Sequence, residues 1–313
     1  MRKLLILVAA LVISLNFSAC GNEKPVENKI SVVTTIFPAY DWAKNIIGDE
    51  NGFDLTLIGG SGVDLHSFQP SANDIAQISA CDVLICVGGD SDSWIFDAIK
   101  HSTNKNLVVI KLIDVLGDKI KPEDAHEHEN HDENHHHDGE IDEHVWLSLK
   151  NAQILCENIA KTLSKVDSSH ENALQTNFNA YKAKISALEG EYQATIAASP
   201  VKTLVFGDRF PFKYLCDDYN LKYFAAFNGC SAETEASFAT IKALADKIDE
   251  LNLHFVLKID GSTHKIAETV ISNTKTHAQT ILTLDSMQSA GKNANYLDIM
   301  AKNLEILREA LSK

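Results

Sequence analysis

The most concentrated chemistry in the chain is the segment HEHENHDENHHHDGEIDEH at 126–144, which holds seven of the thirteen histidines. Neutral imidazole suits Zn²⁺, Cu²⁺ and Ni²⁺, and the intervening carboxylates raise the local cation concentration. No apolar spacing fixes a geometry, however, and a closed tetrahedral site needs ligands that are held in place. We therefore predict that residues 126–137 form a weak, multivalent metal-collecting loop, with a purely solvating acidic loop as the alternative. Its histidines are His126, His128, His131, His135, His136 and His137.

Two further histidines stand next to predicted packed elements. His144 ends the acidic segment and is followed by VWLSLKNAQIL, where apolar residues begin with helical spacing. His66 lies in GGSGVDLHSFQPSANDI, after a Gly-rich turn and before a helix that Ser71 and Asp74 would cap. The carboxyl end of a strand in an α/β fold is where ligands generally bind. Both histidines are candidate metal ligands, and an ordinary loop histidine is the alternative for each.

Other patterns carry weaker predictions. HDENH resembles a zinc-protease motif, but Asp132 replaces the glutamate and no amphipathic helix surrounds it. Asp260 and His264 in KIDGSTHK form a lesser alternative site and are better explained as surface loop residues. Because no motif places a general base beside an open coordination position, we predict that the protein is not an enzyme.

The first residues, MRKLLILVAALVISLNFSAC, predict a secretory signal at 1–19, since two basic residues precede an apolar run and small residues follow it. Cys20, followed by Gly21, resembles a lipobox cysteine that becomes diacylated; ordinary secretion is the alternative. Residues 20–29 then read as a polar tether. No later stretch offers about twenty apolar residues, so we expect an extracytoplasmic protein anchored to a membrane by its N-terminal lipid.

Charge and composition exclude several classes. The formal net charge is −15, and residues 123–144 alone carry ten acids and no Lys or Arg, so the remainder is only mildly acidic. No basic footprint for nucleic acid is present. A chain of 313 residues that is 45% hydrophobic suits a globular protein of about two domains. The cysteines after Cys20 are odd in number and do not indicate a disulfide framework.

Short β-branched runs alternate with helical stretches, as in βαβ units around a parallel sheet. From about 169 to 198 a helical pattern contains one Gly and no Pro, and a helix of about 28 residues there would extend about 42 Å. The predicted fold is α/β, with two lobes that are each a parallel-type sheet flanked by helices, joined by one long rigid helix. The boundaries are 30–168 with the acidic His-rich loop at 123–143, 169–198 for the linking helix, and 199–313.

Several motifs in order carry a resemblance to a known family: HSFQPSANDI, DEHVWLSLKNA, FGDRFPFKYL and LDSMQSAGKNANYLDIMAKNLEIL. Together with the long helix and the His-rich insertion, they resemble the cluster A-I family, the solute-binding lipoproteins of zinc and manganese ABC importers. The resemblance covers the chain from about Ile30 onward, and the His-rich loop points to the zinc branch.

The resemblance implies one metal ion held between the lobes. The family's two N-lobe histidines carry over to His66 and His144. The third position, His or Glu in much of the family, falls on Asp208, and the fourth falls on Asp285. Arg209 could draw Asp208 into an ion pair, which would leave three ligands plus water, Glu143 or Cys230.

Two imidazoles and two carboxylates suit Zn²⁺, although the extra carboxylate makes Mn²⁺ the alternative. The family's function implies a monomer that captures zinc and delivers it to an ABC permease. A manganese or iron carrier, a surface adhesin or metal buffer, and a secreted zinc hydrolase are the rivals. Since a continuous helix resists bending, we expect small lobe shifts in place of a large hinge motion.

Overall fold

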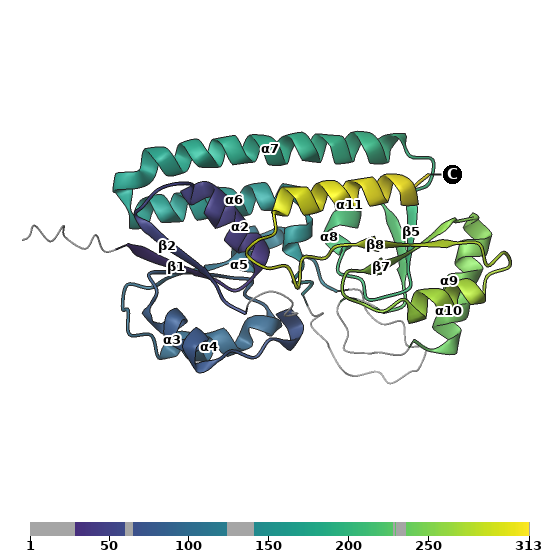
Figure 1. The fold of residues 1–313 in the computed structure, drawn as a ribbon, viewed down its shortest axis with the longest axis horizontal. Helices are drawn as coiled ribbons and strands as arrows, with labels where there is room; N and C mark the ends of the chain where they lie inside the picture. Colours follow the sequence, from purple (N-terminus) through teal and green to yellow (C-terminus); the bar gives the residue numbers. More distant parts are fainter. Residues whose placement is uncertain (1–28, 60–64, 124–140, 228, 230–235, 313) are drawn as a thin grey trace, which may run out of the picture.

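The computed structural model describes residues 29–59, 65–123, 141–227, 229 and 236–312. Within these residues the chain forms two four-stranded parallel sheets (Figure 1). The first sheet has the order β2-β1-β3-β4, with β1 (Ile30–Thr34), β2 (Phe53–Leu57), β3 (Val83–Cys86) and β4 (Val108–Lys111). The second has the order β6-β5-β7-β8, with β5 (Thr203–Phe206), β6 (Lys222–Ala225), β7 (Phe255–Ile259) and β8 (Thr280–Leu284). Both sheets therefore repeat one strand order, and the predicted α/β class is confirmed.

Helices cover both faces of the first sheet, as the near-continuous apolar character of its strands requires. Alternate strand residues separate two cores: Val32 packs with one group of buried side chains and Val33 with another. The two faces are covered by α2 (Phe37–Ile47), α5 (Leu112–Leu116) and α6 (Leu149–Val166) on one side and by α3 (Ala72–Ala80) and α4 (Ser93–Lys100) on the other. The predicted cap is present, since Ser71 and Asp74 form a capping box at the start of α3.

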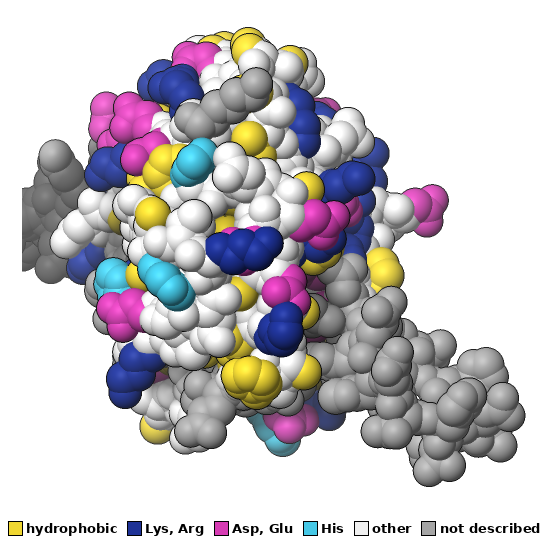
Figure 2. Space-filling view, turned by 90° about the vertical axis from the view of Figure 1, so that its right-hand side faces the viewer, with side chains coloured by type: hydrophobic (Ala, Val, Ile, Leu, Met, Phe, Trp, Pro, Cys, Tyr) yellow, Lys and Arg dark blue, Asp and Glu magenta, His cyan; other side chains and the backbone are white. Residues whose placement is uncertain are grey.

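The second sheet is layered in the same way. Val205 and Val256 face the core formed with α9 (Phe238–Leu251) and α10 (Lys265–Ser272). The opposite face packs into the main core, to which α8 (Lys213–Asp218) and α11 (Tyr296–Ala310) contribute. Figure 2 views the end of this lobe, where acidic and basic side chains intermingle and apolar side chains appear singly or in small groups.

The long helix is α7 (Glu171–Ala198), and it runs along both lobes (Figure 1). It confirms the linking helix predicted from the absence of proline. One stripe of its surface is buried against α6, α2 and α11. That stripe consists of Leu174, Phe178, Tyr181, Ile185, Leu188, Tyr192 and Ile196, at the three- and four-residue spacing of a single helix face.

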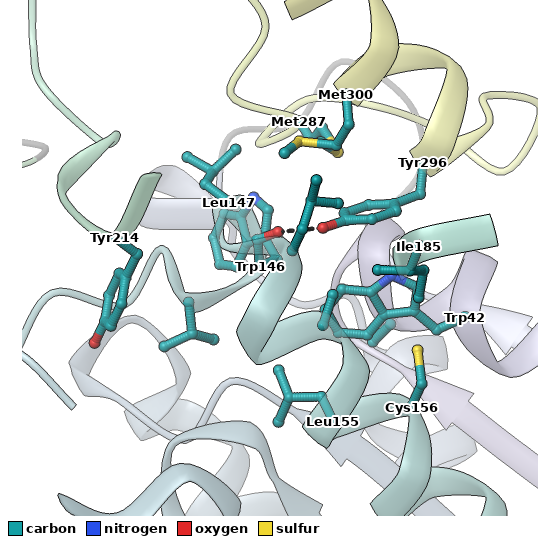
Figure 3. Close-up of a cluster of buried hydrophobic side chains, with 14 of the residues drawn as sticks. Trp42, Trp146, Leu147, Leu155, Cys156, Ile185, Tyr214, Met287, Tyr296 and Met300 are labelled. Atoms are coloured by element: carbon teal, nitrogen blue, oxygen red, sulfur yellow. Dashed lines mark hydrogen bonds between the residues drawn. The ribbon is translucent and has the colours of Figure 1, made fainter. Parts of the chain in front are cut away.

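The lobes also share one apolar core beneath α7. Trp42 meets Tyr296 edge to face, with ring centroids 5.2 Å apart. The Tyr296 hydroxyl donates to the carbonyl of Trp146 at 2.7 Å, and the Trp146 indole donates to the carbonyl of Ser286 at 2.9 Å. Figure 3 shows Trp146, Tyr296 and Met287 packed together at this junction. Because buried, hydrogen-bonded aromatic contacts resist separation, they hold the two lobes together along this side.

Some sequence predictions fall outside the part of the chain that the structure describes. These are the signal, Cys20 and the tether, and they stay predictions, as do the domain boundaries. Among the residues described, no helix combines the length and apolar character needed to cross a membrane.

Candidate metal site

His66 and His144 meet although 78 residues separate them in the chain. Their Nε2 atoms lie 3.2 Å apart, and their rings are tilted by 47°. Two nitrogen ligands of one tetrahedral zinc, each about 2.0 Å from the ion, lie about 3.3 Å from each other. The pair therefore has the nitrogen separation that a shared Zn²⁺ requires.

His144 is fully buried and is held from behind by Asp142. The Asp142 Oδ1 atom accepts from the backbone amide of His144 and pairs with its ring Nδ1, both at 2.8 Å. An ionised carboxylate can only accept, so the ring proton lies on Nδ1 and Nε2 carries the lone pair. This carboxylate–histidine arrangement is the one that orients metal-ligating histidines in general. The chain then continues directly into the 3₁₀ turn η4 (Val145–Leu147) and α6, as predicted for a histidine at a packed junction.

His66 lies in the short 3₁₀ turn η1 (Leu65–Ser67), and its Nδ1 atom is 2.8 Å from the hydroxyl of Ser91. A hydroxyl both donates and accepts, so Ser91 supports either ring tautomer, including the one that leaves the Nε2 lone pair for an ion. The backbone amide of Ser91 donates to Glu143 at 2.9 Å. Gly89 permits this approach, because a Cβ there would lie 2.2 Å from the Glu143 carboxylate.

Two buried acids adjoin the residues of the site, since Glu143 directly precedes His144 and Asp92 directly follows Ser91. Asp92 is fully buried and accepts from the amide of Gly88 at 3.0 Å, while Glu143 accepts from Ser91. Within the described residues, the second oxygen of each carboxylate, Asp92 Oδ1 and Glu143 Oε2, receives no hydrogen bond. Burial raises the pKa of Asp92 to about 6, and the charge of Glu143 adds to the rise. The negative charge of these two carboxylates favours binding of a cation nearby.

Asp208 follows β5 and is 6% exposed. Its Oδ2 atom accepts from the amide of Ile259 at 3.0 Å and from the hydroxyl of Ser262, and its Oδ1 atom accepts from the amide of Arg209 at 2.8 Å. Among the described residues, no ion pair joins the Arg209 guanidinium to this carboxylate, although Arg209 has other interactions. Asp208 instead ties the end of β5 to the end of β7.

Asp285 follows β8, and its Oδ1 atom accepts from the amide of Met287 at 2.8 Å. Burial raises the pKa of this carboxyl, and the neighbouring Asp260 adds to the rise. In the described part of the chain, neither Asp208 nor Asp285 forms a hydrogen bond or an ion pair with His66 or His144. The structure thus brings together two of the four predicted ligands. It holds, among the residues it describes, no group of three or more His, Cys, Asp or Glu arranged to bind a metal ion.

Among the described residues, the C-terminal lobe presents Gln288 to His144. Its Nε2 atom lies 2.6 Å from Nε2 of His144. Sequence reasoning did not single it out, because glutamine is not a preferred zinc ligand. Its position in TLDSMQS, three residues after Asp285, is the only signal that the sequence offers.

The remaining sequence predictions divide into two groups. Asp260 accepts from the amide and hydroxyl of Ser286 and from the hydroxyl of Ser289, and His264 is exposed at the start of α10, as expected for loop residues. The six loop histidines and Cys230 lie outside the described residues.

Comparison with known proteins identifies relatives over almost the whole chain. The family model described as zinc-uptake complex component A, periplasmic (ZnuA), matches residues 32–310. The zinc-binding lipoprotein AdcA of Streptococcus pneumoniae is 28% identical over 99% of this chain, which spans 61% of that protein's length. The high-affinity zinc uptake system protein ZnuA of Bacillus subtilis is 29% identical over 95% of this chain and 92% of its own length.

A solved structure agrees with the sequence relatives. The crystal structure of the Zn(II)-bound ZnuA-like domain of Streptococcus pneumoniae AdcA matches this fold with a TM-score of 0.72 and 25% sequence identity. The match covers 91% of this chain and all of that domain.

Proposed function

The chain belongs to the zinc-uptake complex component A family, and from this premise we propose that it captures Zn²⁺ between its two lobes and delivers it to the permease of an ABC importer. The observation that carries the proposal is the 3.2 Å separation of the His66 and His144 Nε2 atoms. Binding and transfer account for this arrangement without turnover, so the protein acts as a carrier and not as an enzyme.

His66 and His144 are the N-lobe ligands in this proposal. Each ring uses its Nδ1 atom for a protein partner, Ser91 or Asp142, and directs Nε2 toward the other ring. Ser91 allows His66 either to donate an Nε2 proton to His144 or to present its own Nε2 lone pair, and a cation between the rings selects the second tautomer. The protein therefore supplies the ion with two prepositioned nitrogens.

Asp285 and Asp208 are the proposed C-lobe ligands, and their hydrogen bonds rank them. Within the described residues, Asp285 Oδ2 receives no hydrogen bond, and a cation would offset the cost of burying this carboxylate. Asp208 already accepts three hydrogen bonds, so only one lone pair on Oδ1 remains for an ion. Asp285 is thus the principal C-lobe ligand, and Asp208 is the weaker one.

Two imidazoles with two carboxylates give a site of about zero net charge with Zn²⁺. Imidazole favours zinc, whereas additional carboxylate oxygen favours Mn²⁺, so manganese is the alternative cargo. The relatives AdcA and ZnuA are named for zinc, which supports the first choice.

Delivery in this proposal takes place outside the cytoplasm, with the chain anchored through a lipid on Cys20 and acting as a monomer. The continuous α7 and the shared core disfavour a wide hinge opening. Release then depends on local movement of the segments that carry the ligands, while the metal-collecting loop raises the zinc concentration nearby.

Competitive titration with a chromogenic chelator tests the proposal. The purified chain should bind one tight equivalent of Zn²⁺ in preference to Mn²⁺, and His66→Ala should weaken that equivalent at least about 100-fold, because a prepositioned ligand is lost. The matched control is His264→Ala, at an exposed position on the second lobe, and it should leave the affinity unchanged. A tight equivalent that survives His66→Ala would contradict the proposed site.

A further inference from the structure

Gln288 occupies the position on His144 that a metal ion would need. Asp142 holds the ring proton on Nδ1, so the Nε2 atom of His144 has a single lone pair in the ring plane. The Gln288 amide nitrogen, at 2.6 Å, donates to that lone pair. One lone pair cannot serve a hydrogen-bond donor and a zinc ion together. Contact with Gln288 and coordination of zinc by His144 are therefore mutually exclusive.

The turn that carries Gln288 is held in place at Ser286, two residues before it. The Trp146 indole donates to the carbonyl of Ser286, and Asp260 accepts from the amide and hydroxyl of Ser286. Met287 is 1% exposed and adopts φ +61°, a left-handed conformation that residues other than glycine rarely take. Such a conformation is costly and persists where surrounding contacts impose it, often at functional positions. The side chain of Gln288 thus extends from a rigid, strained turn toward the histidine pair.

We propose that Gln288 is a displaceable cap on the histidine pair: its carboxamide occupies the His144 lone pair until zinc displaces it. The inference rests on the proposed function, because it takes His144 to be a zinc ligand. Its consequence is a lower apparent zinc affinity and an ion-controlled contact between lobes. Gln288 belongs to the segment between β8 and α11, whereas His144 precedes α6, so binding of the ion breaks a bond from one lobe to the other.

Gln288→Leu tests the cap, because leucine approximates the shape of glutamine and cannot donate. Removing a hydrogen bond of ordinary net strength should tighten zinc binding about threefold to tenfold and raise the association rate. The matched control is Gln193→Leu on the solvent face of α7, where the glutamine bonds only to the nearby Glu189 in the described structure. This control should bind zinc as the parent does.

Two results for the zinc affinity of Gln288→Leu would overturn the proposal. An unchanged affinity in Gln288→Leu means that the contact does not compete with zinc. A weaker affinity means that the amide turns its oxygen toward the ion and acts as a ligand. Circular dichroism confirms folding of each variant, and Gln288→Ala gives a second test if the leucine variant fails to fold.

A metal-free readout separates this proposal from the proposed function. The imidazole ¹⁵N resonances of His144 should shift in Gln288→Leu and stay unchanged in Gln193→Leu, whether or not zinc binds. If the parent has no tight zinc equivalent that depends on His144, the proposed function fails even though the contact is present. If the parent has that equivalent but the His144 resonances do not respond to Gln288→Leu, only the cap is overturned.

Discussion

The two lobes repeat one sheet topology yet treat their candidate ligands in opposite ways. In the first lobe, Asp142 and Ser91 engage the Nδ1 atoms of His144 and His66, so the Nε2 atoms are left facing each other. In the second lobe, the Asp208 carboxylate is itself engaged, by the Ile259 and Arg209 amides and the Ser262 hydroxyl. We infer that a residue of the right type serves as a ligand only where the hydrogen bonds within its own lobe leave a lone pair for the ion.

Topology explains why both lobes place polar residues here. In each sheet the first strand lies between the second and the third, which creates a switch point at the carboxyl ends of the strands. Asp208 and Asp260 follow β5 and β7 at that point of the second sheet, and Ser91 follows β3 in the first. The first lobe uses the position to orient histidines, and the second uses it largely to join its own strands.

Asp142→Ala should have the largest effect of the variants that sharpen this comparison, because it removes the group that orients His144 without touching a ligand. Loss of such a partner typically lowers metal affinity about 10- to 100-fold. Asp142→Asn, which keeps an acceptor but loses the charge, should fall between the parent and the alanine variant. Zinc affinity by chelator competition, with thermal unfolding as a folding control, checks both. Equal affinity in all three proteins would show that orientation of His144 does not matter.

Substitution of the two acids of the second lobe, Asp285 and Asp208, should have the next largest effects, and the two variants should differ from each other. We expect Asp285→Asn to weaken zinc binding about tenfold, since a charged ligand with an available oxygen is lost. Asp208→Asn should change the affinity less than about threefold but lower the free energy of unfolding by about 1 to 3 kcal/mol, because a buried donor loses its partner. Isothermal titration and urea unfolding measure the two quantities. Equal losses of zinc affinity would break the distinction between the acids.

Asp92→Asn should have the smallest effect on zinc and a clear effect on pH dependence. The folded-state pKa of Asp92 is about 6, above its ordinary value of 3.8, so the folded protein binds the proton more tightly than the unfolded chain. The stability of the parent therefore falls as pH rises from about 4 to about 6, by about 3 kcal/mol at most.

Asparagine does not ionise, so the stability of Asp92→Asn should not fall between about pH 4 and about pH 6. Urea unfolding between pH 4 and pH 7 checks this, with Asp90→Asn as the exposed control on the same turn. Parallel pH profiles for the parent and Asp92→Asn would refute the assignment of this carboxyl.

Much of the fold could be predicted from local patterns. The β-branched runs predict the parallel strands, the absence of proline predicts α7, and Ser71 with Asp74 predicts the start of α3. These features depend on neighbours in the sequence, which is why periodicity and capping rules reach them.

The sequence predicts the two histidines of the site but not the contacts of Asp208 and Gln288, because those contacts join residues that are far apart in the chain. His66 and His144 could be chosen from their positions beside packed elements. The engagement of Asp208 depends on Ile259 and Ser262, about fifty residues away, and no local pattern carries it. Gln288 reaches His144 only through the left-handed turn at Met287, which sequence rules do not expect at a methionine.

Tight zinc binding should belong to the histidine pair and not to the metal-collecting loop. The loop can be removed cleanly, since Pro122 and Ile141 form an antiparallel bridge at its base and Asp142 can be kept. Competitive zinc titration of a chain with residues 124–140 replaced by a short Gly-Ser link, with and without His144→Ala, is the direct measurement. One tight equivalent should survive the replacement and should be lost with His144→Ala. Loss of tight binding with the loop alone would contradict this prediction.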